Sequence, residues 1–235
     1  MKPTPPLGRS HGHVLDDLGR RIAWGEITAG TVVTLAGLEF EFGASRTLIR
    51  EAVRVLESLG MLRSRRRVGI TVQPATEWKA LDSAIVRWNL EGPGRDAQLL
   101  ALMELRSAVE PAAARLAAER ASDADRAELV ALATRLDDLG RAGRGDTPEY
   151  LQVDVDFHAL LLAAGGNPLL AQLKGPVEDI LTGRAALGLT PAIPKEGTLD
   201  HHVATALAIA GGDPDAAETG ARGYVELVTE EVLGR

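Results

Sequence analysis

ASRTLIREAVRVLESLG, residues 44–60, is the stretch that decides the N-terminal part of the fold. At about 100° per residue, one side of a helix collects its apolar residues, Ile49, Ala52, Val53, Leu56 and Leu59. Another side collects three arginines spaced four apart, Arg46, Arg50 and Arg54. Ser45 is a good N-cap residue, and Gly60 suits the C′ position. The stretch is therefore predicted to be an amphipathic helix with an arginine face.

An arginine face has two interpretations. A helix fits the major groove of DNA, and guanidinium groups along one stripe can bind phosphates and guanine edges. The alternative is the solvated face of an ordinary helix. On the first interpretation the residues that contact DNA are those at the start of the helix and along the stripe, namely Ser45, Arg46, Thr47, Arg50 and Arg54.

The flanking sequence favours DNA binding. Residues 61–72, MLRSRRRVGITV, form two short β-prone runs around a turn expected at Val68-Gly69. Helical patterns at residues 14–24 and 35–42 precede the arginine helix. Three helices and a basic hairpin predict a winged helix-turn-helix. The hairpin residues expected to contact DNA are Arg65, Arg66, Arg67 and Gly69.

Charge is distributed unevenly along the 235 residues. The whole chain is acidic, with 26 Lys and Arg against 33 Asp and Glu, which argues against a general coat for nucleic acid. Residues 1–75 nevertheless carry a net charge of +4, from 11 Lys and Arg and 7 Asp and Glu. The remainder therefore carries −11, so only the basic head is expected to contact phosphate.

The composition excludes several other classes of site and of protein. Because the chain has no cysteine, disulfides, thiolate metal sites and thiol catalysis are ruled out. No signal peptide precedes the first helical pattern, and no apolar run approaches about 18 residues. The sequence thus predicts a cytoplasmic protein without a membrane partner. The tail at residues 1–12, rich in proline and glycine, is the segment expected to be disordered.

The second domain is predicted to be an all-helical bundle. We place the boundary near Pro74-Ala75-Thr76, giving a DNA-binding domain at 1–75 and a helical domain at 76–235. Ser122, Thr147 and Asp213 are the best-marked N-caps, and Pro111 is expected to kink its helix without ending it. The helices are expected at residues 77–90, 96–121, 123–142, 148–164, 168–187, 198–210 and 214–233.

A carboxylate and an imidazole occur one turn apart in the helix at 148–164. Asp154 and His158 stack on one face, and together they could bind one divalent cation. The plainer alternative is an Asp-His hydrogen bond along the helix. His201 and His202 lie on a later helix, and because adjacent residues diverge by about 100°, only one of them can point inward.

These motifs together resemble the GntR family of transcriptional regulators, in the FadR-like subgroup with a C-terminal FCD effector domain. The head matches through GASRTLIREA at residues 43–52 and through Gly69. The body matches through LRSAVE at 105–110, DVDFH at 154–158, GNPLL at 166–170, and His202 followed by Gly212-Asp213. Relatives often carry an acidic-arginine pair where this chain has Leu35-Ala36, so one DNA contact is expected to be missing.

The resemblance implies a metal and effector site inside the bundle. It makes Asp154, His158 and His202 the ligands of a divalent ion such as Zn, Ni or Mn, and it places Arg106 opposite a carboxylate of the effector. The family's third histidine falls at Tyr224, and a neutral phenol is a poorer ligand. Two alternatives stay open: a metal held by three groups plus water or effector, or a polar pocket without metal. Tyr224 and Asn167 are expected to join Arg106 in binding the effector.

The predicted function is a transcriptional regulator, a repressor in most such proteins, released by a small carboxylate. A metal next to a guanidinium suits an α-hydroxy acid, and the Trp88-Asn89-Leu90 region is similar to members that sense sugar acids. A homodimer would read a near-palindromic double-stranded operator. One alternative is a metalloregulator that senses the ion itself. The other is a metal-dependent enzyme with Tyr224 or Asp156 as acid or base, which leaves the basic hairpin without a role.

Overall fold

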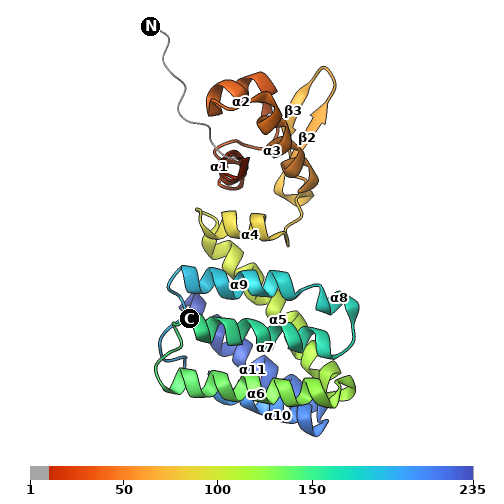
Figure 1. Ribbon diagram of the computed structural model, residues 1–235, viewed down its shortest axis with the longest axis vertical. Helices are drawn as coiled ribbons and strands as arrows, with labels where there is room; N and C mark the ends of the chain where they lie inside the picture. The colour runs from red at the N-terminus through yellow and green to blue at the C-terminus, as the bar shows by residue number, and fades with distance from the viewer. Residues whose placement is uncertain (1–10, 235) are drawn as a thin grey trace. The chain divides into compact units, whose positions relative to one another are not determined.

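The computed structural model describes residues 11–234, and the chain divides into two compact units between Arg95 and Asp96 (Figure 1). Of the tail expected to be disordered, residues 1–10 lie outside the described residues, and the first helix begins at His11. Among the described helices, none has both the length and the apolar character needed to cross a membrane.

The first unit contains the predicted winged helix-turn-helix. Its strands form one antiparallel sheet in the order β1-β3-β2. The hairpin β2-β3 and the three helices were predicted, so this fold class is confirmed, whereas the short strand β1 was not predicted. The elements are α1 (His11–Ala23), β1 (Val32–Val33), α2 (Leu35–Phe42), α3 (Arg46–Ser58), β2 (Leu62–Arg65) and β3 (Gly69–Val72).

Helix α3 has the boundaries and faces that its sequence predicted. The Ser45 hydroxyl accepts a hydrogen bond from the Leu48 amide at 3.4 Å, and Gly60 adopts a positive φ of 78° just after the helix. All five residues of the predicted apolar face are buried in the core of this unit: Ile49, Ala52, Val53, Leu56 and Leu59.

The turn of the hairpin differs from its prediction. It spans residues 66–68 with Arg67 in the left-handed region at φ 67°, whereas the sequence placed it at Val68-Gly69. Gly69 instead opens β3 at φ 113°, and a Cβ there would come within 2.8 Å of Val32. Glycine is thus needed because β1 packs so closely, a contact that the sequence pattern did not reveal.

The segment after the hairpin belongs to the first unit. Where one helix was expected at 77–90, the structure has a 3₁₀ turn, η1 (Ala75–Glu77), and α4 (Ser83–Leu90), which the Asp82 carboxylate caps. Trp88 packs in the N-terminal core against Gly19, whose place tolerates no Cβ because the indole would lie within 2.4 Å. This compact unit therefore extends to Arg95, beyond the domain boundary predicted at residue 75.

The second unit is the predicted all-helical bundle. Helix α7 packs against α6 and α9, and α10 packs against α6 and α11; Figure 1 shows α9, α7 and α6 side by side. The segment predicted as one helix at 168–187 forms two helices, α8 and α9. Helix α5 continues through Pro111, as predicted. The helices are α5 (Arg95–Arg120), α6 (Asp123–Arg141), α7 (Pro148–Ala164), α8 (Pro168–Ala171), α9 (Lys174–Ala186), α10 (Thr198–Gly211) and α11 (Pro214–Leu233).

The N-caps predicted for this unit are confirmed. Ser122 accepts from the Asp125 amide, Thr147 from the Tyr150 amide at the start of α7, and Asp213 from the Ala216 amide. Each cap satisfies a backbone N–H at a helix start, and Thr147 therefore sets where α7 begins.

Candidate functional site

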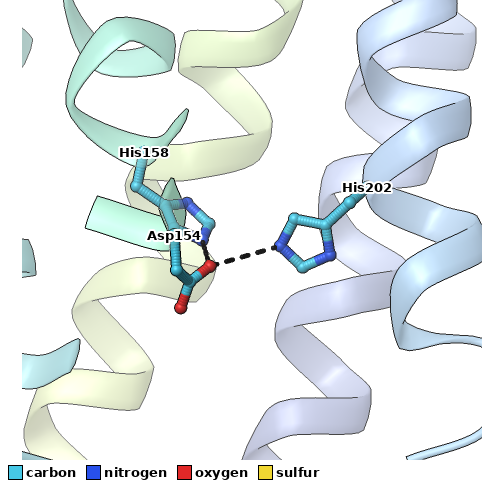
Figure 2. Close-up of side chains that lie close together, drawn as sticks. All are labelled: Asp154, His158 and His202. Carbon is cyan, nitrogen blue, oxygen red and sulfur yellow. Dashed lines mark ion pairs between the residues drawn. The ribbon is translucent and has the colours of Figure 1, made fainter. Parts of the chain in front are cut away.

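Three side chains from two helices meet inside the bundle (Figure 2). Asp154 and His158 lie one turn apart on α7, and the His158 Nε2 atom is 3.2 Å from Asp154 Oδ1. From α10, the His202 Nε2 atom lies 3.9 Å from the same carboxylate oxygen. One ligand atom from each residue lies within 4.8 Å of the others, so the structure brings together the three residues predicted as metal ligands.

The orientation of His202 is set by its own helix. Its Nδ1–H donates to the Thr198 carbonyl at 2.8 Å, which leaves the Nε2 lone pair directed toward Asp154. That Nε2 atom is buried and has no hydrogen-bond partner within the described chain. As expected for adjacent residues, only one histidine of the pair is buried, and His201 is partly exposed.

Helix α5 adds an ion pair that is fully buried beside the three ligands. Arg106 Nε donates to Glu110 Oε1 at 2.5 Å, and its Nη2 lies 3.3 Å from the other carboxylate oxygen. The same Nη2 is 3.1 Å from His158 Nε2, while Glu110 Oε2 is 3.1 Å from His158 Nδ1. Arg106 was predicted to face the effector, but most of its guanidinium is engaged by Glu110.

Tyr224 of α11 completes the cluster. Its ring is stacked on His202 and lies edge-on to His158, with ring centroids 5.4 Å apart in the second pair. Its hydroxyl is buried and unpaired within the described residues, as is Arg106 Nη1. Arg106 and Tyr224, two of the three residues predicted to bind an effector, therefore each have a buried polar atom without a hydrogen-bond partner in the described chain.

Burial and neighbouring charges shift the pKa values of the three side chains in this cluster. Burial lowers the pKa of His202 to about 4, with His158 adding to the effect. Burial disfavours the Asp154 carboxylate too, but His158 and the other cations outweigh it and lower its pKa to about 2. For His158, burial is the largest effect and lowers the pKa, but Glu110 and Asp154 together outweigh it, so the pKa is raised. At neutral pH His202 is thus a neutral imidazole and Asp154 a carboxylate, the forms that bind metals.

The donor set fits a divalent ion. One carboxylate and two imidazoles that converge in this way are suitable ligands for Zn, Ni or Mn, and an ion held by three protein groups would have positions left for other ligands. The Thr198 carbonyl on His202 Nδ1 is an outer partner of the kind that such histidines require, and the Glu110 carboxylate lies 3.1 Å from His158 Nδ1 without hydrogen-bond geometry. Arg106 Nη2 lies 3.1 Å from His158 Nε2, the nitrogen that faces Asp154, so an ion bound there would compete with the guanidinium for this nitrogen.

The predicted DNA-contacting residues lie on one exposed surface of the first unit. Ser45, Arg46, Thr47, Arg50 and Arg54 are exposed on α3, as are the arginines of the hairpin, Arg65, Arg66 and Arg67. A shallow hollow is lined jointly by Arg46, Arg65, Arg66 and Gly69, and Leu35-Ala36 form part of its wall. The structure thus joins the start of α3 to the hairpin in one basic surface.

One predicted effector residue lies elsewhere. Asn167 comes after the C-terminal end of α7, and its side-chain oxygen accepts from the Leu169 amide at 3.0 Å as the N-cap of α8. The GNPLL motif that suggested it therefore marks a helix start, with no contact to the cluster of Asp154, His158 and His202.

Sequence reasoning also missed two buried residues. Glu110 is spaced four residues from Arg106, and that spacing alone predicts a pair on one helix face. Arg184 of α9 is buried, a placement that could have been suspected because it falls in register with Val177, Ile180 and Leu181 of the apolar face.

Comparisons with known proteins agree with both units. Residues 11–72 match the family described as bacterial regulatory proteins, gntR family, and residues 101–227 match the FCD domain. The galactonate operon transcriptional repressor of Escherichia coli (strain K12) is 32% identical over 208 residues, which are 87% of this chain and 88% of that protein. The transcriptional repressor NanR of Cronobacter sakazakii is 26% identical over 196 residues, 80% of this chain and 71% of its own.

Solved structures share the fold. A GntR protein of Streptococcus agalactiae superposes with a TM-score of 0.50 at 24% identity, covering 94% of this chain and all of that one (100%). The Listeria monocytogenes protein Lar, described as controlling expression of the agr system, gives a TM-score of 0.60 at 17% identity, covering 96% and 97%. Residues 73–100 lie between the two matched families, and they include the helix α4 that packs with the first unit.

Proposed function

Since this chain belongs to the gntR family of bacterial regulatory proteins and carries an FCD domain, we propose that it is a repressor whose affinity for its operator is controlled by a small hydroxy acid. The relatives found are transcriptional regulators, so the chain is a regulator of transcription and the metal-dependent enzyme is set aside. In the proposal residues 1–75 bind DNA, and the helical bundle within residues 76–235 binds the effector and forms the homodimer.

The observation that carries the effector site is the convergence of unsatisfied polar atoms. His202 Nε2, Arg106 Nη1 and the Tyr224 hydroxyl are buried near Asp154 without partners among the described residues. Each such atom costs about 1–3 kcal/mol, and native proteins keep few of them without a reason. A bound ion and an acidic ligand would satisfy all three.

The class of effector follows from the donor set and from one relative. A divalent ion on Asp154, His158 and His202 keeps open positions, which a carboxylate and an adjacent hydroxyl can fill together. A relative is named as the repressor of a galactonate operon, and galactonate is an α-hydroxy acid with a polyhydroxy chain. We therefore assign an aldonate, with D-galactonate as the first compound to test.

DNA binding is assigned to α3 and to the hairpin β2-β3. Arg46, Arg50 and Arg54 would contact the major groove, with Ser45 and Thr47 at the helix start and the hairpin arginines on the flanking phosphates. Two such heads in a homodimer require a near-palindromic operator. The effector shifts operator affinity by the difference in its affinity for the two head arrangements, about 1–3 kcal/mol in typical cases.

The metalloregulator remains the second candidate because Asp154, His158 and His202 could bind an ion without any acid. In that case metal alone would change operator affinity. In our proposal metal is required but the acid is the signal.

The test combines metal analysis, thermal shift and gel shift with DNA from upstream of its own gene. We expect Zn, Ni or Mn in the purified protein, stabilisation by about 2.7 kcal/mol when D-galactonate is at 100 times its Kd, and release from the operator. Asp154→Asn should lose the metal and the response. The control is Asp156→Asn, an exposed carboxylate two residues away that accepts from Gln152. Equal responses from the two variants would overturn the site.

A further inference from the structure

Arg184 of α9 is a buried arginine that lies outside the cluster of Asp154, His158 and His202. Its side chain is 6% exposed, and its one ion pair places Nη2 at 3.3 Å from Glu231 Oε2 of α11. Its Nε atom is fully buried and has no partner among the described residues. By comparison, Arg106 Nε is taken by Glu110 at 2.5 Å, so Arg184 has the less satisfied guanidinium.

The charge of Arg184 is only partly compensated. Burial and the positive charge of Arg106 lower its pKa, and Asp154 and Glu231 offset this in part. Glu231 is 19% exposed, which weakens its contribution as a counterion. A buried guanidinium with a free donor is costly for the fold alone, and such groups concentrate at binding sites.

The pair lies along the bundle from the metal ligands. Glu231 is seven residues beyond Tyr224 on α11, which is about 10 Å along the helix axis. Arg184 is close enough to Asp154 to interact with its charge. The exposed fraction of the side chain is 1% at His158, 13% at Asp154 and 19% at Glu231, so Glu231 is the most solvent-accessible of these three groups.

We propose that Arg184 and Glu231 form a second subsite that binds the distal hydroxyl groups of a sugar acid whose carboxylate end lies at Asp154, His158 and His202. The inference rests on the proposed function and deepens it, because it selects long polyhydroxy acids over short hydroxy acids. In this arrangement the hydroxyl groups at the far end of a six-carbon acid would bind the pair, whereas a three-carbon acid such as lactate has no hydroxyl beyond the one next to its carboxylate.

The chemistry of the pair suits hydroxyl groups. A hydroxyl both donates and accepts, and the pair offers the unpaired Nε–H donor of Arg184 next to carboxylate acceptors on Glu231. Hydrogen bonds to charged groups are the stronger ones, and a site built for a hydroxyl discriminates strongly against a ligand that lacks it.

The experiment titrates D-galactonate and L-lactate calorimetrically into the metal-loaded full-length protein and its Arg184→Met variant. We expect the variant to lose about tenfold or more in affinity for D-galactonate, the loss of one charged hydrogen bond, with lactate affinity unchanged. The melting temperature of the ligand-free variant should equal or exceed that of the wild type, because a poorly compensated buried charge has been removed. Arg222→Met is the control, since that arginine is exposed on α11 and its ion pair among the described residues is with Glu218 alone.

Each other outcome overturns the inference in a distinguishable way. Unchanged galactonate affinity in Arg184→Met shows that no hydroxyl contacts Arg184. Equal losses for both acids show that Arg184 acts through the metal ligands instead. Failure of the wild type to bind either acid rejects the proposed function together with the subsite. If Arg184→Met does not fold, Glu231→Gln decides, and it must also weaken galactonate while sparing lactate.

Discussion

The phenol ring of Tyr224 is stacked on the imidazole of His202, with 4.2 Å between the ring centroids and 19° between the planes. The resemblance to FCD domains expects a third histidine at position 224, eleven residues after Asp213. The tyrosine thus covers one side of the metal-ligand cluster and keeps an unpaired hydroxyl there. Position 224 thus carries a tyrosine that stacks on His202, where the resemblance implies a histidine that would bind the metal.

We predict that Tyr224→His increases metal affinity by about tenfold or more. Imidazole is the better ligand for Zn, Ni or Mn at neutral pH, and α11 already holds position 224 against His202 and His158. Competition with a chromophoric chelator measures the change. Tyr224→Phe is the matched control because it keeps a ring and removes the hydroxyl. If phenylalanine and histidine have the same effect, position 224 does not reach the ion.

We expect Arg106 and Glu110 to stabilise the fold only when both charged side chains are present. Arg106→Met leaves the Glu110 carboxylate, which is 0% exposed, without its main counterion, and we expect a loss of about 3–5 kcal/mol in the free energy of unfolding. Adding Glu110→Gln should recover much of the loss. Urea unfolding in EDTA measures both variants.

The control for the Arg106–Glu110 pair is Arg222–Glu218, an exposed pair with the same four-residue spacing. Arg222→Met should lower the free energy of unfolding by less than about 1 kcal/mol. Equal costs at the two sites would mean that burial of the Arg106 pair has no energetic consequence.

On the DNA-binding face, Arg50→Ala should cost about 1–3 kcal/mol of operator binding and leave the fold intact. Arg50 is exposed and makes no ion pair within the part of the chain that the structure describes, whereas Arg54 pairs with Glu51 at 2.8 Å. Gel shift with the operator measures the loss, with Arg120→Ala in the helical unit as the control. Binding by Arg50→Ala at wild-type affinity would reject α3 as the recognition helix.

Stability without metal should fall as the pH drops from about 6.5 to about 4. The pKa of His202 is lowered to about 4 in the folded protein, so in this window the unfolded chain binds a proton that the folded one does not. Stability therefore rises with pH across the window, by at most about 3 kcal/mol for a shift of this size.

Urea unfolding at several pH values in EDTA measures that slope, and His202→Gln should flatten it. The lowered pKa values of Asp154 and Glu110 also make stability rise with pH, but only below about pH 5, so the slope between about pH 5 and 6.5 is the part assigned to His202. A slope that is unchanged in His202→Gln would show that another group is responsible.

For the first unit, local sequence predicted most of the structure. The spacing of Ile49, Ala52 and Val53, together with the caps Ser45 and Gly60, defined α3, because periodicity and capping act within a few residues. Strand β1 and the position of α4 could not be predicted in this way. Both depend on contacts between segments distant in sequence, β1 with β3 and Trp88 with Gly19.

For the site in the bundle, sequence by itself determined the residues that are linked by helical spacing or by family motifs: Asp154 with His158 on one helix face, and His202 on another helix. Tertiary structure alone decided that Glu110 occupies most of the Arg106 guanidinium and that Asn167 caps a helix away from the ligands. It also decided that Arg184 is buried next to them. The reason is physical: a helical repeat fixes which face a side chain takes, but its partners and its desolvation depend on which helices pack around that face.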